Sequence, residues 1–127
     1  MSRPNRARGE KPLYWIASSL DDLLAFPESV KDEIGTALSA AQFGSKHPRA
    51  KPWKGTGSGV FEVVEDYRGG AYRAIYTVRF ANAVYALHAF QKKSPSGIKT
   101  ARKDVELVGQ RLKLAQQDYE VRYGEQK

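Results

Sequence analysis

The chain changes its hydrophobic period at Gly59, and this change most strongly limits the folds that it can adopt. Beyond Gly59, apolar and polar side chains alternate with a period of two, which predicts β-strands. The three predicted strands are Val60–Asp66, Ala71–Phe80 and Val84–Phe90. Gly69-Gly70 and Ala81-Asn82-Ala83 separate these strands and suit hairpin turns. Strands joined by such short turns form an antiparallel meander.

Helical periods lie on both sides of the meander. Apolar residues three and four apart predict helices, and a short aromatic run predicts one more strand. These elements are a strand at Leu13–Ile16, a helix through Leu20–Leu24, a helix from Pro27 to Gly44 and a helix over Ile98–Glu120. The predicted fold class is α+β, with the N-terminal strand and the meander in one antiparallel sheet, two N-terminal helices and a C-terminal helix. We expect the helices to cover one face of the sheet and to leave the other partly open.

The chain has the length of one domain. It has 127 residues, of which 41% are hydrophobic, and this supplies a single core. We expect a disordered basic arm at residues 1–11, one domain at residues 12–120 and a tail at residues 121–127. The absence of cysteine excludes disulfides and cysteine-ligated zinc. No apolar run approaches the roughly 18 residues of a membrane helix, so we expect a cytoplasmic protein without membrane contact.

The charge of the chain predicts an anionic partner. The net charge is +7, and such an excess favours nucleic acid, an acidic protein or a membrane surface as partner. The densest positive segment is the loop at residues 45–58, which has no acidic residue. Its basic side chains are Lys46, Arg49, Lys51 and Lys54. Trp53 lies among them and offers a flat face for a nucleic-acid base.

Three motifs follow one another along the meander. They are Gly59-Val60-Phe61-Glu62-Val63, Tyr72-Arg73-Ala74-Ile75-Tyr76 and Leu87-His88-Ala89-Phe90-Gln91-Lys92-Lys93-Ser94. In this order they resemble the motifs of the RelE/HigB toxin superfamily, and in particular its phage-derived HigB-like branch. The likeness covers residues 13–116. One position departs from it, because Val64 stands where the family usually has an arginine, and Arg68 or Arg73 would have to supply that charge.

The resemblance implies the toxin of a type II toxin–antitoxin system. Such a protein is expected to be an endoribonuclease (an mRNA interferase) that cuts messenger RNA, usually on the ribosome, and so inhibits translation and growth. It would need no metal or cofactor, and the sequence has no cluster of histidines and carboxylates at metal-ligand spacing. A cognate antitoxin, often a helix-turn-helix protein, is the implied partner.

The candidate catalytic residues are Arg73, His88, Lys54 and Lys92. When a ribose 2′-hydroxyl attacks the adjacent phosphate, the reaction needs a base, an acid and cations for the phosphate charge. Arg73 can bind phosphate through two parallel hydrogen bonds, and strand alternation places it on the face of Thr77 and Arg79. His88 can act as acid or base, although a histidine on an apolar strand can equally be structural.

The candidate RNA-binding residues are Lys46, Arg49, Lys51, Trp53, Arg68, Tyr76, Arg79 and Lys93. Tyr76 is included as a stacking face, although an aromatic residue on a sheet more often belongs to the core. His47 lies beside a proline in the basic loop, where it is either solvated or facing RNA. Glu62 is expected to hold an arginine in place rather than to act as the base.

Two other functions fit the same sequence. ParE-like relatives share the fold and inhibit DNA gyrase through protein contacts, for which neither His88 nor the basic loop is needed. An RNA-binding module without catalysis is the other alternative, because Val64 replaces the family's arginine. A small helix-turn-helix gene beside this one would favour the two toxin hypotheses.

Overall fold

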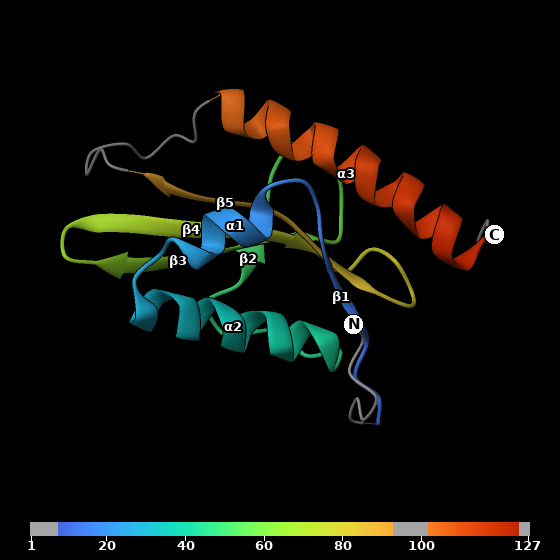
Figure 1. The fold of residues 1–127 in the computed structure, drawn as a ribbon, viewed down its shortest axis with the longest axis horizontal. Coiled ribbons are helices and arrows are strands. Elements are labelled where there is room, and N and C mark those ends of the chain that lie inside the picture. Colours follow the sequence, from blue (N-terminus) through green and yellow to red (C-terminus); the bar gives the residue numbers. More distant parts are fainter. Residues whose placement is uncertain (1–7, 93–101, 125–127) are drawn as a thin grey trace.

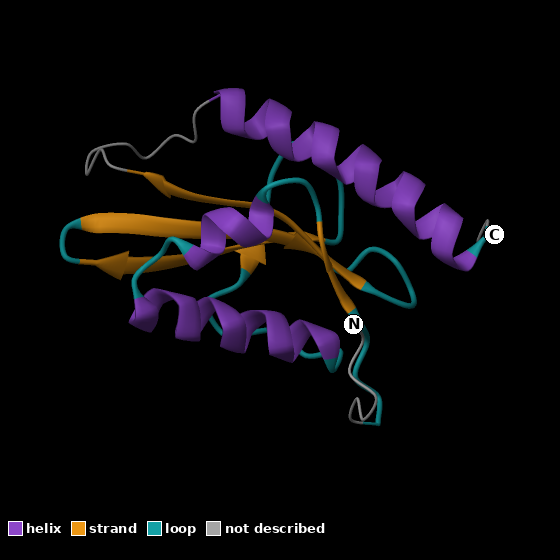
Figure 2. Ribbon diagram, viewed as in Figure 1, coloured by secondary structure: helices purple, strands orange, loops and turns teal. Residues whose placement is uncertain are grey.

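The computed structural model describes residues 8–92 and 102–124, which form a five-stranded sheet between helices (Figure 1, Figure 2). The elements are β1 (Leu13–Trp15), α1 (Ser19–Leu24), α2 (Glu28–Gln42), β2 (Lys51–Pro52), β3 (Val60–Tyr67), β4 (Gly70–Thr77), β5 (Val84–Lys92) and α3 (Arg102–Tyr123). The strand order is β1-β5-β4-β3-β2. β1 runs parallel to β5, and all other neighbours are antiparallel. The predicted α+β fold, with an N-terminal strand beside a meander, is confirmed, but the prediction that this strand is antiparallel to its neighbour is wrong.

Helices cover both faces of the sheet. α3 packs on one face, where Val108 belongs to a core cluster with Leu87, whereas α2 packs on the other face through Val30 and Ile34 (Figure 1). The expectation that one face is left open is therefore wrong. The reason lies in β5, whose residues Val84–Ala89 are all buried. A strand that is apolar on both sides needs a layer on each face.

The β3–β4 hairpin turns at Arg68 and Gly69 rather than at the predicted Gly69-Gly70. Tyr67 pairs with Gly70, and φ is +50° at Arg68 and +84° at Gly69. Positive φ at both central residues is the geometry of a type I′ turn, whose twist matches that of the flanking strands. The turn therefore places the exposed Arg68 at the far end of the hairpin.

Strand boundaries in the basic loop and in the meander also differ from the predicted ones. β2 was not predicted, because two residues are too few to show an alternation. β4 ends at Thr77, and the next backbone N–H, that of Val78, donates to the carbonyl of Gly59 at 2.9 Å. Beyond this bond the chain turns, and the backbone N–H of Arg79 donates to Thr77 Oγ1 at 3.1 Å, so the strand does not continue to Phe80.

The two ends of the domain are described in part. Residues 1–7 of the predicted arm and the predicted helix start at residues 98–101 lie outside the described residues. Two hydrogen bonds of 2.8 Å join Lys11 to Gln42. The backbone N–H of Lys11 donates to the carbonyl of Gln42, and the side-chain amide of Gln42 donates to the carbonyl of Lys11. α3 continues to Tyr123, into the predicted tail.

Two glycines test how far backbone conformation alone affects stability. A Cβ added at Gly35, inside α2, or at Gly69, in the hairpin turn, meets no atom within 4 Å. We expect Gly35→Ala to raise the free energy of unfolding by about 1 kcal/mol, because alanine favours a helix. Gly69→Ala should lower it by about 1–2 kcal/mol, because φ is positive there. Urea denaturation measures both, and changes of equal sign would contradict the assigned turn.

Candidate functional site

A row of charged side chains crosses the face of the sheet on which α3 packs. Lys51 in β2 lies directly opposite Glu62 in β3, and residues opposite each other in an antiparallel pair share a face. Arg73 in β4 donates from Nη1 to Glu62 Oε2 at 2.6 Å. Ile75, two residues further along β4, belongs to the core cluster that includes α3. Lys51, Glu62 and Arg73 therefore lie on the α3 side.

The ion pair between Arg73 and Glu62 is largely withdrawn from water. The exposed fractions of the two side chains are 13% and 8%. A charge in such surroundings needs a partner, and removing one member leaves the other uncompensated, which costs about 3–5 kcal/mol. Glu62 therefore fixes the Arg73 guanidinium, as the sequence predicted for this carboxylate.

Arg73 also lies next to the position where the family usually has an arginine. It is directly opposite Val64 in the β3–β4 register, so the two residues share a face of the sheet. Arg68 lies in the hairpin turn, with its guanidinium 5.2 Å from the centre of the Tyr67 ring. Of the two candidates for the missing charge, the register favours Arg73.

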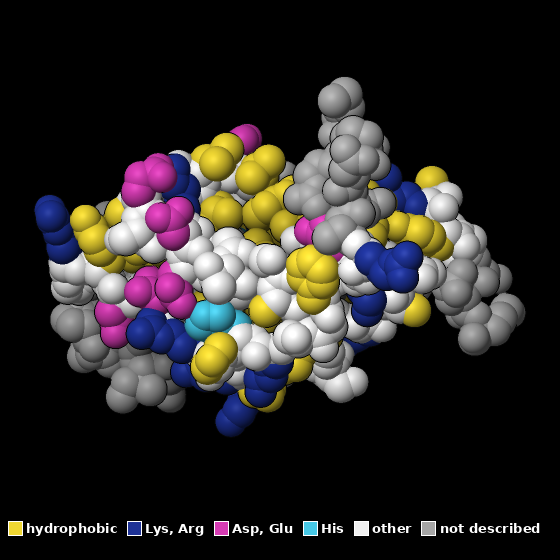
Figure 3. Space-filling view, turned by 90° about the horizontal axis from the view of Figure 1, so that it is seen from below, with side chains coloured by type: hydrophobic (Ala, Val, Ile, Leu, Met, Phe, Trp, Pro, Cys, Tyr) yellow, Lys and Arg dark blue, Asp and Glu magenta, His cyan; other side chains and the backbone are white. Residues whose placement is uncertain are grey.

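The sheet divides the basic loop into two parts. Lys46 lies 5.5 Å from the centre of the Phe61 ring, and Arg49 pairs with Glu65. Phe61 packs in the cluster that includes α2, and Glu65 shares its strand face by alternation. In the view onto the α2 side, basic and acidic side chains gather around a histidine (Figure 3). Lys46 and Arg49 are therefore on the opposite face from Arg73, and the loop does not form one continuous patch.

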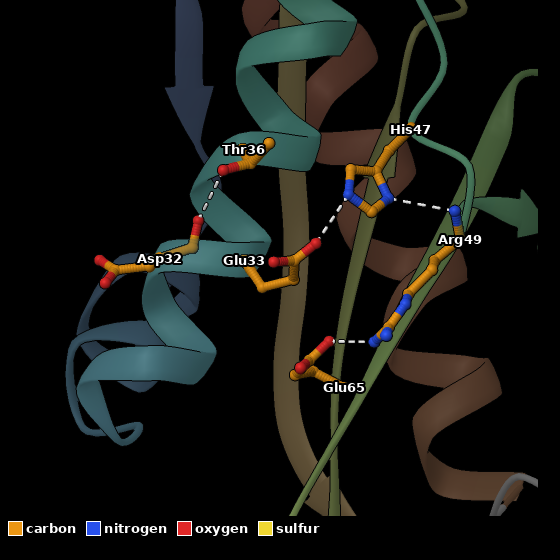
Figure 4. Close-up of polar contacts among 6 residues, drawn as sticks. All are labelled: Asp32, Glu33, Thr36, His47, Arg49 and Glu65. Carbon is orange, nitrogen blue, oxygen red and sulfur yellow. Dashed lines mark hydrogen bonds and ion pairs between the residues drawn. The ribbon is translucent and has the colours of Figure 1, made fainter.

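His47 ties the basic loop to α2. Its Nε2 is 2.9 Å from Glu33 Oε2, and its Nδ1 accepts the backbone N–H of Arg49 at 3.1 Å (Figure 4). Because Nδ1 accepts, Nε2 is the nitrogen that donates to the carboxylate. The ring is buried. His47 is therefore neither solvated nor facing an RNA surface, which were the two surroundings predicted for it.

His88 lies beneath α3 and is held by two α3 side chains. Its Nε2 is 3.0 Å from Asp104 Oδ1, and its Nδ1 is 3.5 Å from Arg111 Nη1. Since a carboxylate accepts and a guanidinium only donates, the neutral ring donates from Nε2 and accepts at Nδ1. The side chain is 8% exposed. This position matches the structural alternative for His88, and both ring nitrogens are already engaged.

The two aromatic residues predicted to stack on bases are in the core. Trp53 is 5% exposed and belongs to the cluster on the α3 side, and Tyr76 is 1% exposed and belongs to the cluster on the α2 side. Burial raises the pKa of Tyr76 to about 12. The stacking predictions for Trp53 and Tyr76 are therefore wrong, because neither ring has a face open to a ligand. Their burial follows from the two-sided core.

The remaining candidate cations lie at different edges of the sheet. Lys54 is exposed and follows Trp53, and Lys92 is half-buried at the end of β5, opposite Ala71. Arg79 is exposed beyond the end of β4, where its guanidinium donates to backbone carbonyls of the β2–β3 loop. Lys93 lies outside the described residues.

Asp104 and Arg111 are the residues of this region that the sequence interpretation missed. Arg111 is buried and donates to the carbonyl of Leu87 at 3.0 Å as well as facing His88. A signal for it was present, because Arg111 stands three residues after Val108 and four before Ala115 on the apolar stripe of the helix. A charge on a buried stripe requires a specific partner.

The described residues form neither a metal-binding cluster nor a membrane-spanning helix. Within residues 8–92 and 102–124, no three histidine, cysteine, aspartate or glutamate side chains gather so that they could hold a metal ion. None of the described helices is both long enough and apolar enough to cross a membrane.

The sequence matches the family described as Phage derived protein Gp49-like (DUF891) over residues 21–113. This match spans most of the chain, and the chain therefore belongs to that family. No curated protein is a significant match.

Two solved structures are similar to the chain. A mutant of the E. coli toxin RelE in the free state is 14% identical, with a TM-score of 0.51, and the match covers 83% of this chain and 97% of that one. The toxin–antitoxin complex RelBE2 from Mycobacterium tuberculosis is 19% identical, with a TM-score of 0.42, and the match covers 69% of this chain and 98% of that one. The likeness to RelE shows a RelE-like fold, as the motifs implied.

The buried position of His88 predicts a dependence of stability on pH. Burial lowers the pKa of His88 from its ordinary value of 6.5, against the hydrogen bond that the ring donates to Asp104, which raises it. Below pH 6.5 the unfolded chain takes up a proton that the folded chain resists, so the free energy of unfolding falls as the pH falls. We expect urea denaturation between pH 7 and 5 to show a smaller fall for His88→Gln than for the wild type. If the free energy of unfolding depended equally on pH in the two proteins, the His88 ring would be in water and not buried.

Proposed function

We propose that the chain is the toxin of a type II toxin–antitoxin system and that it cuts messenger RNA without a metal ion. One observation carries the proposal: a buried carboxylate, Glu62, fixes Arg73 on the same sheet face as the exposed Lys51. Membership of the phage-derived family and the RelE-like fold support a toxin. The endoribonuclease activity and its setting on the ribosome, in the cytoplasm, belong to the proposal.

The proposed chemistry is an attack within the RNA strand. The ribose 2′-oxygen loses its proton and bonds to phosphorus, while the bond to the 5′-oxygen breaks and that oxygen gains a proton. Negative charge on the phosphate oxygens is highest in the transition state, where fixed cations are most effective. Arg73 supplies the fixed guanidinium. Of Lys51 and Lys54, one accepts the 2′-proton as the neutral amine, and the other donates a proton to the 5′-oxygen as the ammonium. His88 anchors α3 in this scheme and does not contact RNA.

Arg73 is the residue on which activity should depend most. We expect Arg73→Ala to lower the cleavage rate by a factor of about 10²–10³, the usual effect of removing one transition-state donor. Induced expression in bacteria, with growth and messenger RNA ends recorded, measures it. Wild-type protein should stop growth and produce new ends inside translated messages, and Arg73→Ala should do neither.

The controls separate lost chemistry from lost folding. Arg73→Ala combined with Glu62→Gln removes both charges and avoids an uncompensated buried carboxylate, so it should fold and remain inactive. Arg102→Ala removes an arginine whose side chain is 91% exposed on α3, and it should remain toxic. Growth arrest with intact messages would favour the gyrase hypothesis, and a folded, active double variant would rule out the role of Arg73.

A cognate antitoxin is the proposed protein partner. Lys51 and Lys54 are exposed, and neither forms an ion pair within the part of the chain that the structure describes. An acidic segment of the antitoxin can bind such cations and exclude RNA from them.

Co-expression tests this partner directly. We expect a small helix-turn-helix gene beside this one, and its product should restore growth when both proteins are made. Lys51→Glu with Lys54→Glu should weaken the complex, because two attractions become repulsions. A neighbouring product that binds wild type and variant equally would place the antitoxin elsewhere on the surface.

A further inference from the structure

A second basic site lies between α3 and the loop that joins β2 to β3. The structure has a cavity there of about 380 Å³, within the size range of small-molecule sites. It is lined by Gly55, Thr56, Arg79, Gly109, Leu112, Lys113 and Gln116. Two of these side chains are cationic, and no carboxylate is among them.

The Arg79 guanidinium is fixed in this cavity by neutral partners. Its Nε and Nη2 donate to the carbonyl of Ser58, at 3.0 and 2.8 Å, and Nη2 also donates to the carbonyl of Thr56 at 2.6 Å. Among the described residues, no carboxylate pairs with Arg79. The loop therefore holds the side chain in place without cancelling its charge, as an anion-binding site requires.

Glycines in the loop permit this close approach. A Cβ at Gly57 would lie 3.0 Å from Arg79 Nη2, and a Cβ at Gly59 would lie 3.2 Å from Arg79 Cα. Both glycines have positive φ, +87° and +84°. The backbone is thus shaped around the guanidinium, which loses little freedom when a ligand binds.

α3 supplies the other wall. Lys113 is exposed and has no ion pair among the described residues, and Gly109 leaves the helix surface open where a larger side chain would fill the cavity. Gln116 donates to Glu120 at 2.8 Å, and Glu120 itself does not line the cavity.

The Thr56 hydroxyl adds an independent observation. Its Oγ1 is buried and has no hydrogen-bond partner in the described part of the chain. A buried hydroxyl without a partner is uncommon in proteins, and a bound water or ion nearby is one of the arrangements that accounts for it.

We propose that this cavity binds one nucleotide unit of the RNA strand, with its phosphate between Arg79 and Lys113. The inference rests on the proposed function and names a contact for the RNA beyond the cutting site. The two sites are connected along the chain, because Lys54 immediately precedes Gly55. The apolar side chain of Leu112 lines the cavity where the sugar or base would lie.

The test measures binding of a short single-stranded RNA whose 2′-hydroxyls are methylated, so that no cleavage occurs. Fluorescence anisotropy at several salt concentrations gives the affinity and its salt dependence. Lys113→Gln should weaken binding about tenfold at low salt and lower the slope of log K against log salt by about 0.7, the loss of one phosphate contact to a single strand. Gly109→Leu should also weaken binding, because it fills the cavity without changing the charge.

Lys103→Gln is the matched control. It removes the same charge from an exposed position on the same helix, about 15 Å away along the axis, and should bind like the wild type. The proposal is overturned if Lys103→Gln loses as much affinity as Lys113→Gln, if folded Gly109→Leu binds normally, or if the wild type does not bind RNA. Binding with the expected pattern, but without new messenger RNA ends when the wild type is expressed in bacteria, would leave the cavity site standing and refute the nuclease. If Lys113→Gln cleaved RNA with an unchanged KM, the nuclease proposal would stand and the cavity site would be refuted.

Discussion

The guanidinium of Arg111 joins three parts of the chain, and the arrangement of the layers depends on it. From α3 it donates to the carbonyl of Leu87 in β5 and, at 3.0 Å, to Ser18 Oγ before α1, and it faces the ring of His88. A buried charge is tolerated only when it is hydrogen-bonded and compensated. Asp104 belongs to the same network and carries the opposite charge. It accepts a hydrogen bond from His88, whose other ring nitrogen faces Arg111. Helix α3 is thereby fixed both to the sheet and to the N-terminal segment.

Two side chains of the basic loop attach it to the rest of the domain. Arg49 is engaged by Glu65, and His47 is engaged by Glu33, so these side chains of the basic loop hold the loop to β3 and α2 (Figure 4). Lys51 lies beyond this attachment, at the start of the sheet. The loop is therefore held to β3 and α2 on the α2 side, where Lys46 and Arg49 are also exposed, while Lys51 is exposed on the α3 side.

Two different devices fix arginines on that α3 side. Arg73 is oriented by the carboxylate of Glu62. This ion pair fixes the direction of the guanidinium and partly offsets its positive charge. Arg79 is oriented by the carbonyls of Thr56 and Ser58, which leave its charge intact. The first arrangement suits a group that must act at one atom of a substrate, and the second suits attraction of a phosphate.

Hydrophobic periods and turn residues act over short distances, so they were enough to predict every element except the two-residue β2, together with the element order and the α+β class. The sequence also indicated that Glu62 would pair with an arginine. Only the tertiary structure decided which faces are covered, since the apolar run in β5 buries both its sides and draws α3 onto the face expected to be open. Packing of α3 buried Trp53 and His88, and packing on the α2 side buried Tyr76. The physical reason is that burial depends on contacts between segments far apart in the chain, which no local pattern records.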